Sequence, residues 1–161
     1  MASTASVAQN KYIGSAKCKV CHNAPDKGVQ YTKWAGSKHS KALERLKSDT
    51  AKLIGSTRGV ADPSTNAKCL KCHATAFGVA TDLLGGLTLA EGVSCESCHG
   101  AGSAYKNPAI MKNLADAKSK GLTIPNEKIC LKCHNSESPV FKSFDFKTYY
   151  AKISHKNPKR K

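Results

Sequence analysis

The sequence is poor in the residue types from which a protein core or a membrane anchor is usually built. Its 161 residues include only four Phe, five Tyr, one Trp and two Met, and acidic residues number 11. No apolar run approaches the roughly 20 residues that a membrane-spanning helix needs, so no such helix is predicted. The length suits one domain, which we place at residues 11–155, with a flexible segment 1–10 before it and a basic tail 156–161 after it.

Cysteine is abundant by comparison, and its spacing is regular. The eight cysteines form four C-x-x-C pairs, and each pair is followed directly by His. This pattern attaches a c-type haem: the two thiols add to the two vinyl groups of one porphyrin, and the histidine reaches the iron. The predicted cofactor-binding residues are Cys18, Cys21 and His22, then Cys69, Cys72 and His73, then Cys95, Cys98 and His99, and finally Cys130, Cys133 and His134.

Zinc sites and disulfides also use cysteine, but they explain this pattern less well. Two zinc sites with four thiolate ligands each would use all eight cysteines and leave the four trailing histidines unexplained. A disulfide framework does not require a gap of two residues within each pair. Six His in 161 residues place one at a given position about one time in 27 by chance, and here it happens four times. We therefore predict four covalently attached haem c groups.

Positive charge dominates the composition. There are 26 Lys and Arg against 11 Asp and Glu, which gives a formal net charge of +15. Each haem carries two propionates, so four haems bring up to eight negative charges and leave 15 − 8 = +7. Much of the lysine excess therefore balances propionates, and the remainder suits docking on redox proteins with acidic surfaces. Nucleic acid is not an expected partner, since the lysines are scattered among the cysteine motifs.

The first ten residues bear on the cellular location of the protein. Residues 1–10 are small and polar and contain no apolar stretch of the signal-peptide type. Attachment of haem to C-x-x-C-H motifs in bacteria requires export from the cytoplasm. The sequence is therefore interpreted as the mature form of an exported, periplasmic protein.

Local patterns in the first half predict one substantial helix among loops. Residues 30–47 have apolar side chains spaced for one side of a helix, and His39 would lie within it. Residues 11–29 around the first motif and residues 48–68 are predicted loops, because Gly, Pro, Asn and Asp recur in them. Residues 77–89 are predicted as loop or short extended pairing.

Two further helices are predicted in the second half. The pair Asn107–Pro108 is a typical helix start, Gly121 is a natural stop, and Met111 would lie between them. A last helix is predicted from Asp145, with His155 near its end. The expected fold class is mainly α-helical with extensive loops, a small multihaem cytochrome c fold built around four covalently bound haems.

The number of histidines limits how the irons can be ligated. Four irons have eight axial positions, and the four motif histidines fill one position each. Only His39 and His155 remain. One chain therefore allows at most two haems with two histidine ligands, and the other two irons need another donor or none.

Over most of residues 11–155, the chain resembles the cytochrome c-554 family of tetrahaem electron carriers. The pattern W-x-x-S-x-H-x-x-A at residues 34–42 resembles the family's distal-histidine segment. Residues 69–78 resemble its second-haem segment, and the sequence GVSCESCHG at residues 92–100 is close to its third-motif signature. Residues 144–155 are similar to its C-terminal helix, which ends in a ligand histidine.

The resemblance implies a set of iron ligands. His39 would lie opposite His99 on the third haem, and His155 would lie opposite His134 on the fourth. The family's second haem is five-coordinate, which fits the lack of a further histidine for His73. The family's first haem takes a distal histidine shortly after the third motif.

This chain departs from the family at the first haem. Residues 101–114 contain no histidine, and Met111 is the best substitute there. A thioether ligand would raise the reduction potential relative to two histidines. The alternative is that Met111 only fills space in the core, as methionine often does. The predicted iron ligands are His22, Met111, His73, His99, His39, His134 and His155.

These features indicate an electron carrier with no catalytic residues. Four haems in so short a chain lie close together, and different ligand sets would spread their potentials. An alternative is binding or reduction of a small ligand such as nitric oxide at an open iron on His73, although no cluster of Arg, His or Lys for proton delivery is evident there. A third possibility is an assembly in which neighbouring chains supply ligands. Since no histidine is spare, we expect a monomer.

Overall fold

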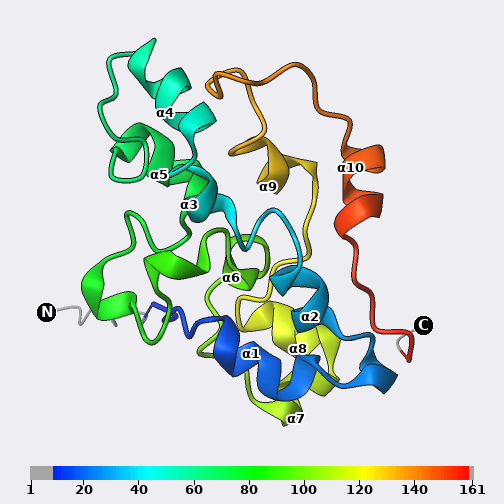
Figure 1. Ribbon diagram of the computed structural model, residues 1–161. Helices are drawn as coiled ribbons and strands as arrows, with labels where there is room; N and C mark the ends of the chain where they lie inside the picture. Colours follow the sequence, from blue (N-terminus) through cyan, green and yellow to red (C-terminus); the bar gives the residue numbers. More distant parts are fainter. Residues whose placement is uncertain (1–8, 160–161) are drawn as a thin grey trace, which may run out of the picture.

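Short helices joined by long loops make up the chain (Figure 1). The computed structural model describes residues 9–159, and these contain no strand, only an isolated parallel bridge between Tyr12 and Leu84. A mainly α-helical fold with extensive loops is therefore confirmed. The helices are α1 (Ser15–His22), η1 (Pro25–Lys27), α2 (Gln30–Ala35), α3 (Ala42–Arg45), α4 (Asp49–Ser56), α5 (Ala67–His73), η2 (Thr81–Leu83), η3 (Leu89–Glu91), α6 (Cys95–His99), α7 (Pro108–Lys112), α8 (Leu114–Ser119), α9 (Glu127–Leu131) and α10 (Phe146–Ile153).

The helix predicted over 30–47 is interrupted. Between α2 and α3 the chain forms a series of turns, and His39 lies in them. The Ser40 hydroxyl donates to the carbonyls of Ala35 at 2.9 Å and Ser37 at 3.0 Å. A serine hydroxyl that binds nearby carbonyls competes with the helical pattern of hydrogen bonds. The prediction that His39 lies within a helix is therefore wrong.

Two regions predicted as loops are partly helical. The first motif lies on α1, and α4 occupies part of residues 48–68. Ser48 is the N-cap of α4, where its side chain accepts the Ala51 N–H at 3.3 Å. This capping bond satisfies one of the amide groups left open at a helix start, and it stabilises a helix of only two turns.

The predicted helix starts in the second half are confirmed. Asn107 caps α7 by accepting the Ala109 N–H at 2.9 Å, and Asp145 caps α10. The single helix expected between Asn107 and Gly121 is instead two helices, α7 and α8. Asn113 ends the first and caps the second by accepting the Ala115 N–H at 2.9 Å.

The side-chain core is small. The buried apolar residues among those described number ten, and four of these are alanines. One cluster, Leu46, Leu70 and Ala74, joins α3 to α5. No large side chain in the described part of the chain is fully buried. Direct apolar packing between helices therefore contributes little to the stability of this fold.

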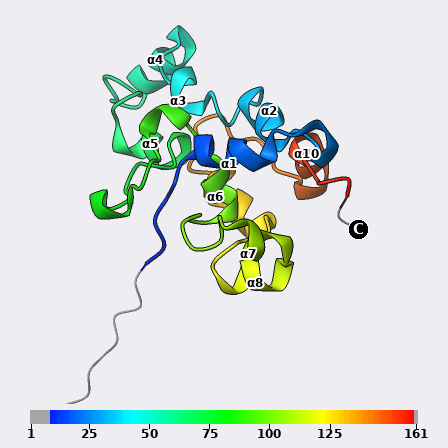
Figure 2. The same ribbon diagram turned by 90° about the horizontal axis from the view of Figure 1, so that it is seen from below.

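Both predicted terminal segments extend beyond the described residues. Residues 1–8 of the predicted segment 1–10, and residues 160–161 of the predicted tail, lie outside them. The described end of the tail runs back to η1, where the Lys159 Nζ lies 2.5 Å from the Asp26 Oδ2 (Figure 2). Within residues 9–159, no helix has the length and apolar character to cross a membrane.

Candidate haem sites

The third motif lies between the first and the fourth. The Cys18 thiol on α1 and the Cys95 thiol on α6 lie close enough for each to shift the pKa of the other. At the other end of α6, Cys98 lies close enough to Cys130 on α9 for their charges to interact. Helices α1 and α6 are neighbours in both views of the ribbon (Figures 1 and 2). The order in space of these three motifs is therefore first, third, fourth.

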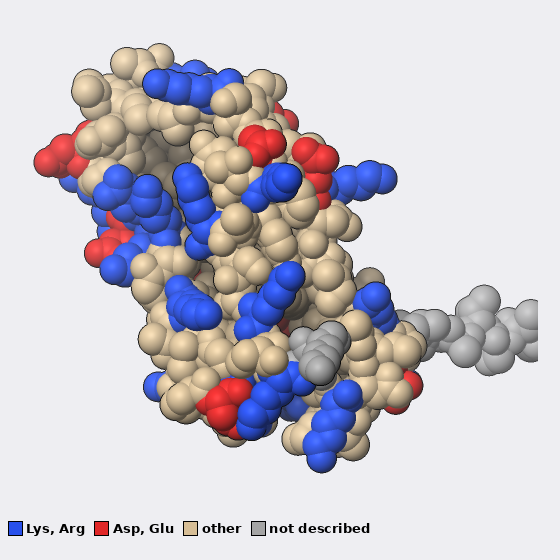
Figure 3. Space-filling model, turned by 90° about the vertical axis from the view of Figure 1, so that its right-hand side faces the viewer, with Lys and Arg blue, Asp and Glu red and all other residues tan. Residues whose placement is uncertain are grey.

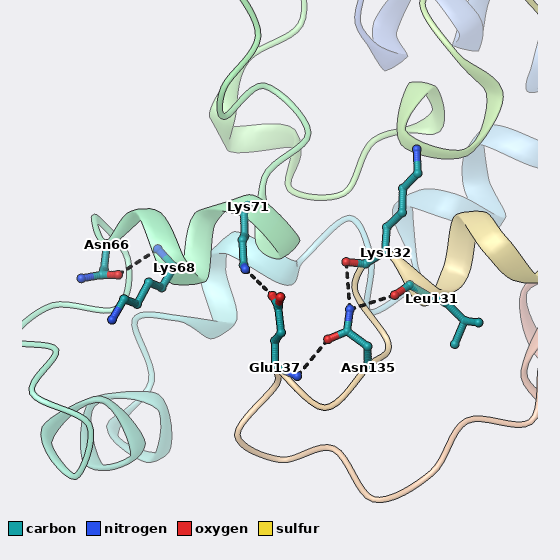
Figure 4. A network of polar contacts seen from close by, with 7 residues as sticks. All are labelled: Asn66, Lys68, Lys71, Leu131, Lys132, Asn135 and Glu137. Carbon is teal, nitrogen blue, oxygen red and sulfur yellow. Dashed lines mark hydrogen bonds and ion pairs between the residues drawn. The ribbon is translucent and has the colours of Figure 1, made fainter.

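The second motif lies beside the fourth. Cys72, the second cysteine of the motif on α5, lies close enough to Cys133 to raise the pKa of its thiol. Lys71, the residue before it, forms an ion pair with Glu137 in the loop that follows the fourth motif (Figure 4). That loop is shaped by Asn135, whose amide donates to two carbonyls of α9 and its end, and whose oxygen accepts the Glu137 N–H at 2.9 Å. The four attachment sites thus follow one another as first, third, fourth and second.

His39 faces the histidine of the fourth motif. The ring centres of His39 and His134 are 6.0 Å apart. Two imidazoles on opposite sides of one metal ion, each with a metal–nitrogen bond of about 2 Å, have ring centres roughly 6 Å apart. The turn that carries His39 is held by Val93, whose N–H donates to the His39 carbonyl at 2.9 Å. The expected pairing of His39 with His99 is therefore wrong, since the ring of His39 lies beside that of His134.

His155 faces the histidine of the third motif. The ring centres of His99 and His155 are 6.1 Å apart, so the expected pairing of His155 with His134 is also wrong. The Nδ1 of His99 lies 3.2 Å from the Thr123 carbonyl, and the Nδ1 of His155 lies 2.8 Å from the Ile153 carbonyl. A ring nitrogen that donates to a carbonyl sets the tautomer and leaves the Nε2 of each ring to bind a metal.

The protonation of two of these rings also suits metal binding. Burial lowers the pKa of His39 below its ordinary value, and the neighbouring His134 lowers it further. Burial likewise lowers the pKa of His99, although its bond to the Thr123 carbonyl acts in the opposite direction. Both rings are therefore neutral near pH 7, which is the form that binds iron.

His73 lies on the wall of a cavity of about 470 Å³. Its Nδ1 is 2.7 Å from the Ala42 carbonyl, which again leaves the Nε2 for a metal. Cys69 of the same motif lines the cavity, and the segment Ser138–Val140 lies on its wall. No histidine other than His73 lines this cavity among the described residues. The arrangement fits a haem with one histidine ligand.

Basic side chains also line this cavity. They are Arg45 from the end of α3, Arg58 from just after α4 and Lys68 from α5, and all three are exposed. No pattern in the sequence indicates this cluster beside His73. The three positions come from separate segments of the chain, and only the fold brings them to one cavity. Arginine forms strong paired hydrogen bonds with carboxylates, so the cluster suits the propionates of a haem.

The fourth motif has a smaller cavity with aromatic walls. Cys133 and His134 line a space of about 260 Å³ together with Phe144 and Tyr149. The Phe144 ring stacks on His134 at 4.8 Å and on Tyr149 at 5.2 Å between centres. Val140 lines this cavity and the one beside His73, and its side chain is 65% exposed. Apolar walls that the chain itself leaves uncovered suit the faces of a flat porphyrin.

Met111 lies half-buried on α7, in the part of the molecule that also holds α1 and α6 (Figures 1 and 2). The segment before α1 is tied to the loop before α7, where the Lys11 N–H donates to the Ser103 Oγ at 2.8 Å. This bond joins the chain just before the first motif to the chain just before α7. Ligation of iron by Met111 opposite His22 stays a prediction.

Together, the facing histidine pairs at the third and fourth motifs and the cavities at the second and fourth motifs fit covalently bound haem. The fold and the sites define a multihaem c-type cytochrome. Residues 17–100 match the family Cytochrome c554 and c-prime, which is just over half of the chain. The chain therefore belongs to this family, as the sequence patterns predicted, and the family's four haem c groups account for all eight cysteines.

Two comparisons with individual proteins agree with the family. The chain is 29% identical over 143 residues to "Cytochrome c-554" of Nitrosomonas europaea (strain ATCC 19718 / CIP 103999 / KCTC 2705 / NBRC 14298). This match covers 76% of the chain and 57% of that protein, so the chain spans a little over half the length of this curated relative. The solved structure "Reduced state of cytochrome c554 from Nitrosomonas europaea" is similar with a TM-score of 0.59 and 26% identity, covering 92% of this chain and 80% of that one.

Proposed function

We propose that this protein carries electrons between redox partners in the periplasm or elsewhere outside the cytoplasmic membrane. The observation that carries the proposal is the unbroken series of attachment sites, in which Cys18 meets Cys95, Cys98 lies by Cys130, and Cys133 meets Cys72. Bound haem supplies one-electron redox chemistry, while a protein supplies orientation, burial and ligands. We also propose that residues 11–155 act as one domain, because each site draws on residues distant in the sequence.

The ligands proposed for the four irons are not alike. Bis-histidine, His/Met and single-histidine sites have different potentials, so such a set would spread the four potentials along the series. All six histidines are used in this assignment. The proposed sets are His39 with His134, His155 with His99, Met111 with His22, and His73 alone.

The partners proposed are redox proteins with acidic docking surfaces. Cationic side chains outnumber anionic ones on the face that includes α10, and they are spread across it rather than gathered at one place (Figure 3). A widespread positive field speeds diffusional encounter with an acidic protein by roughly tenfold or more. A carrier that docks briefly benefits from a fast encounter more than from tight binding.

In a reductive titration, the haem-loaded protein is expected to take up four electrons per chain.

The rate of its reduction by an acidic redox protein is expected to fall by roughly tenfold as salt rises from about 0.01 M to about 0.5 M, because screening shortens the reach of the positive field. Stopped-flow spectroscopy measures this rate. Uptake of fewer than four electrons would contradict the cofactor count, and turnover of nitric oxide by the reduced protein would contradict a carrier role in favour of an enzyme.

Met111→Ala is expected to remove the near-infrared sulfur-to-iron band of the ferric protein, since that band requires a thioether ligand. The potential of one haem should fall or its iron become high-spin, because His/Met ligation stabilises the ferrous state. The matched control is Met1→Ala, which removes the other methionine of the chain and should leave the band unchanged. A ferric wild-type protein without the band would show that Met111 is not a ligand.

A further inference from the structure

A buried carboxylate lies inside the third motif. Glu96 follows Cys95 directly, and it is only 2% exposed. Its Oε1 accepts the Ile13 N–H at 2.9 Å and the Gly102 N–H at 2.7 Å, and its Oε2 accepts the Gly14 N–H at 2.9 Å. Three backbone N–H groups therefore bind the two oxygens of this one buried carboxylate, and hydrogen bonds to a charged acceptor are among the stronger ones.

A second carboxylate binds the same stretch of chain. Glu91 accepts the Ser15 N–H through its Oε2 at 2.8 Å. Gly14 and Ser15 begin α1, which has no capping side chain of its own. Glu91 and Glu96, both from the segment of the third motif, therefore provide the N-terminal cap of the helix that carries the first motif. Negative charge at this end of a helix is favourable.

Among the described residues, neither of these two carboxylates forms an ion pair. The ion pairs in this part of the chain join Lys52 to Asp49, Lys71 to Glu137 and Lys159 to Asp26.

The charge of Glu96 acts on its surroundings. Burial and then Glu96 raise the pKa of Tyr105, whose hydroxyl donates to the carbonyls of His99 and Gly100. Tyr105 is thus a link between the carboxylate and the backbone of the third motif's histidine.

We propose that Glu96, assisted by Glu91, is a positioning and tuning residue that locks α1 against α6 and lowers the reduction potentials of the first and third haems. This inference rests on the proposed function, since it assumes haem at both motifs. Ferric haem carries one more positive charge than ferrous haem, so a buried anion nearby favours the ferric state. The Cys18–Cys95 contact places both haem attachment sites beside this carboxylate.

The test is potentiometric titration of haem-loaded Glu96→Gln. Glutamine keeps the shape of the side chain and removes its charge. Two of the four midpoint potentials are expected to rise, with about a tenfold higher ferrous-to-ferric ratio at the wild-type midpoint, which corresponds to about 59 mV for a one-electron couple. The matched control is Glu44→Gln on the exposed surface of α3, which should leave all four potentials unchanged.

A second variant is needed in case Glu96→Gln does not fold with four haems. In Glu96→Gln, the new amide meets the Gly14 N–H, and this mismatch can block folding. Glu91→Gln removes a charge at a half-buried position that accepts the Ser15 N–H, and it should raise the same potentials by less. Wild-type potentials in a four-haem Glu96→Gln protein would overturn this inference but not the proposed function. The same holds for wild-type potentials in Glu91→Gln if Glu96→Gln does not fold. A wild-type protein without haem would overturn the proposed function as well.

Discussion

Produced without haem attachment, the chain is expected to lose most of its helical circular dichroism signal and to show no cooperative thermal transition. The described residues contain ten buried apolar side chains, and the one core cluster, Leu46, Leu70 and Ala74, lies at a single end of the series of motifs. Helices of four to eight residues are not stable alone in water. Binding of the cofactor is therefore expected to supply much of the folding free energy, as in other metal-organised domains.

Far-ultraviolet circular dichroism and a thermal melt test this expectation. The control is the haem-loaded protein in the same buffer, which should melt in one transition. A native-like spectrum and a cooperative melt from the haem-free chain would show that the loops and short helices hold together without porphyrin. Side-chain packing would then be stronger than the buried residues indicate.

Replacing His39 with Ala is expected to convert one low-spin iron per chain to high-spin, and that iron should be the one bound to His134. The 6.0 Å between the two ring centres leaves the space of one metal ion between them. His155→Ala should have the same effect on the iron bound to His99. Low-temperature electron paramagnetic resonance of the ferric protein counts the high-spin irons, and the double variant should gain two.

The identity of the affected iron separates this pairing from the reverse one. A crystal structure of haem-loaded His39→Ala should show an open coordination position opposite His134 and intact coordination at His99. Lys38→Ala, which changes the exposed residue before His39, is the matched control and should add no high-spin signal. Loss of the ligand opposite His99 in the His39 variant would disprove the pairing of His39 with His134.

The attachment chemistry could be predicted from the sequence because it is local. Two thiols and a histidine within five residues bind one porphyrin whatever the rest of the chain does. Helix starts at Asn107 and Asp145 were predicted for the same reason, since an N-cap bonds to an amide two or three residues away. The break after Ala35 and the cap at Ser48 were missed, because serine hydroxyls suit turns, caps and loops alike.

Long-range partners could not be predicted in this way. The basic cluster of Arg45, Arg58 and Lys68 comes from three separate elements, and no spacing in the sequence relates them. Glu96 occupies a variable position of a C-x-x-C-H motif, where its contacts with residues more than 80 positions earlier leave no local signal. The resemblance to a family implied that His39 and His155 are iron ligands, but it paired them with His99 and His134, the reverse of the pairing in the structure.

The sequence by itself determined that four haems are attached, at which cysteines, and that only two histidines remain as further ligands. The tertiary structure alone decided that His39 meets His134, that His155 meets His99, and that the sites follow one another as first, third, fourth and second. The difference is physical. Haem attachment is a bond within one short segment, whereas an opposite ligand must be brought from far along the chain by turns and anchors such as the Val93–His39 hydrogen bond.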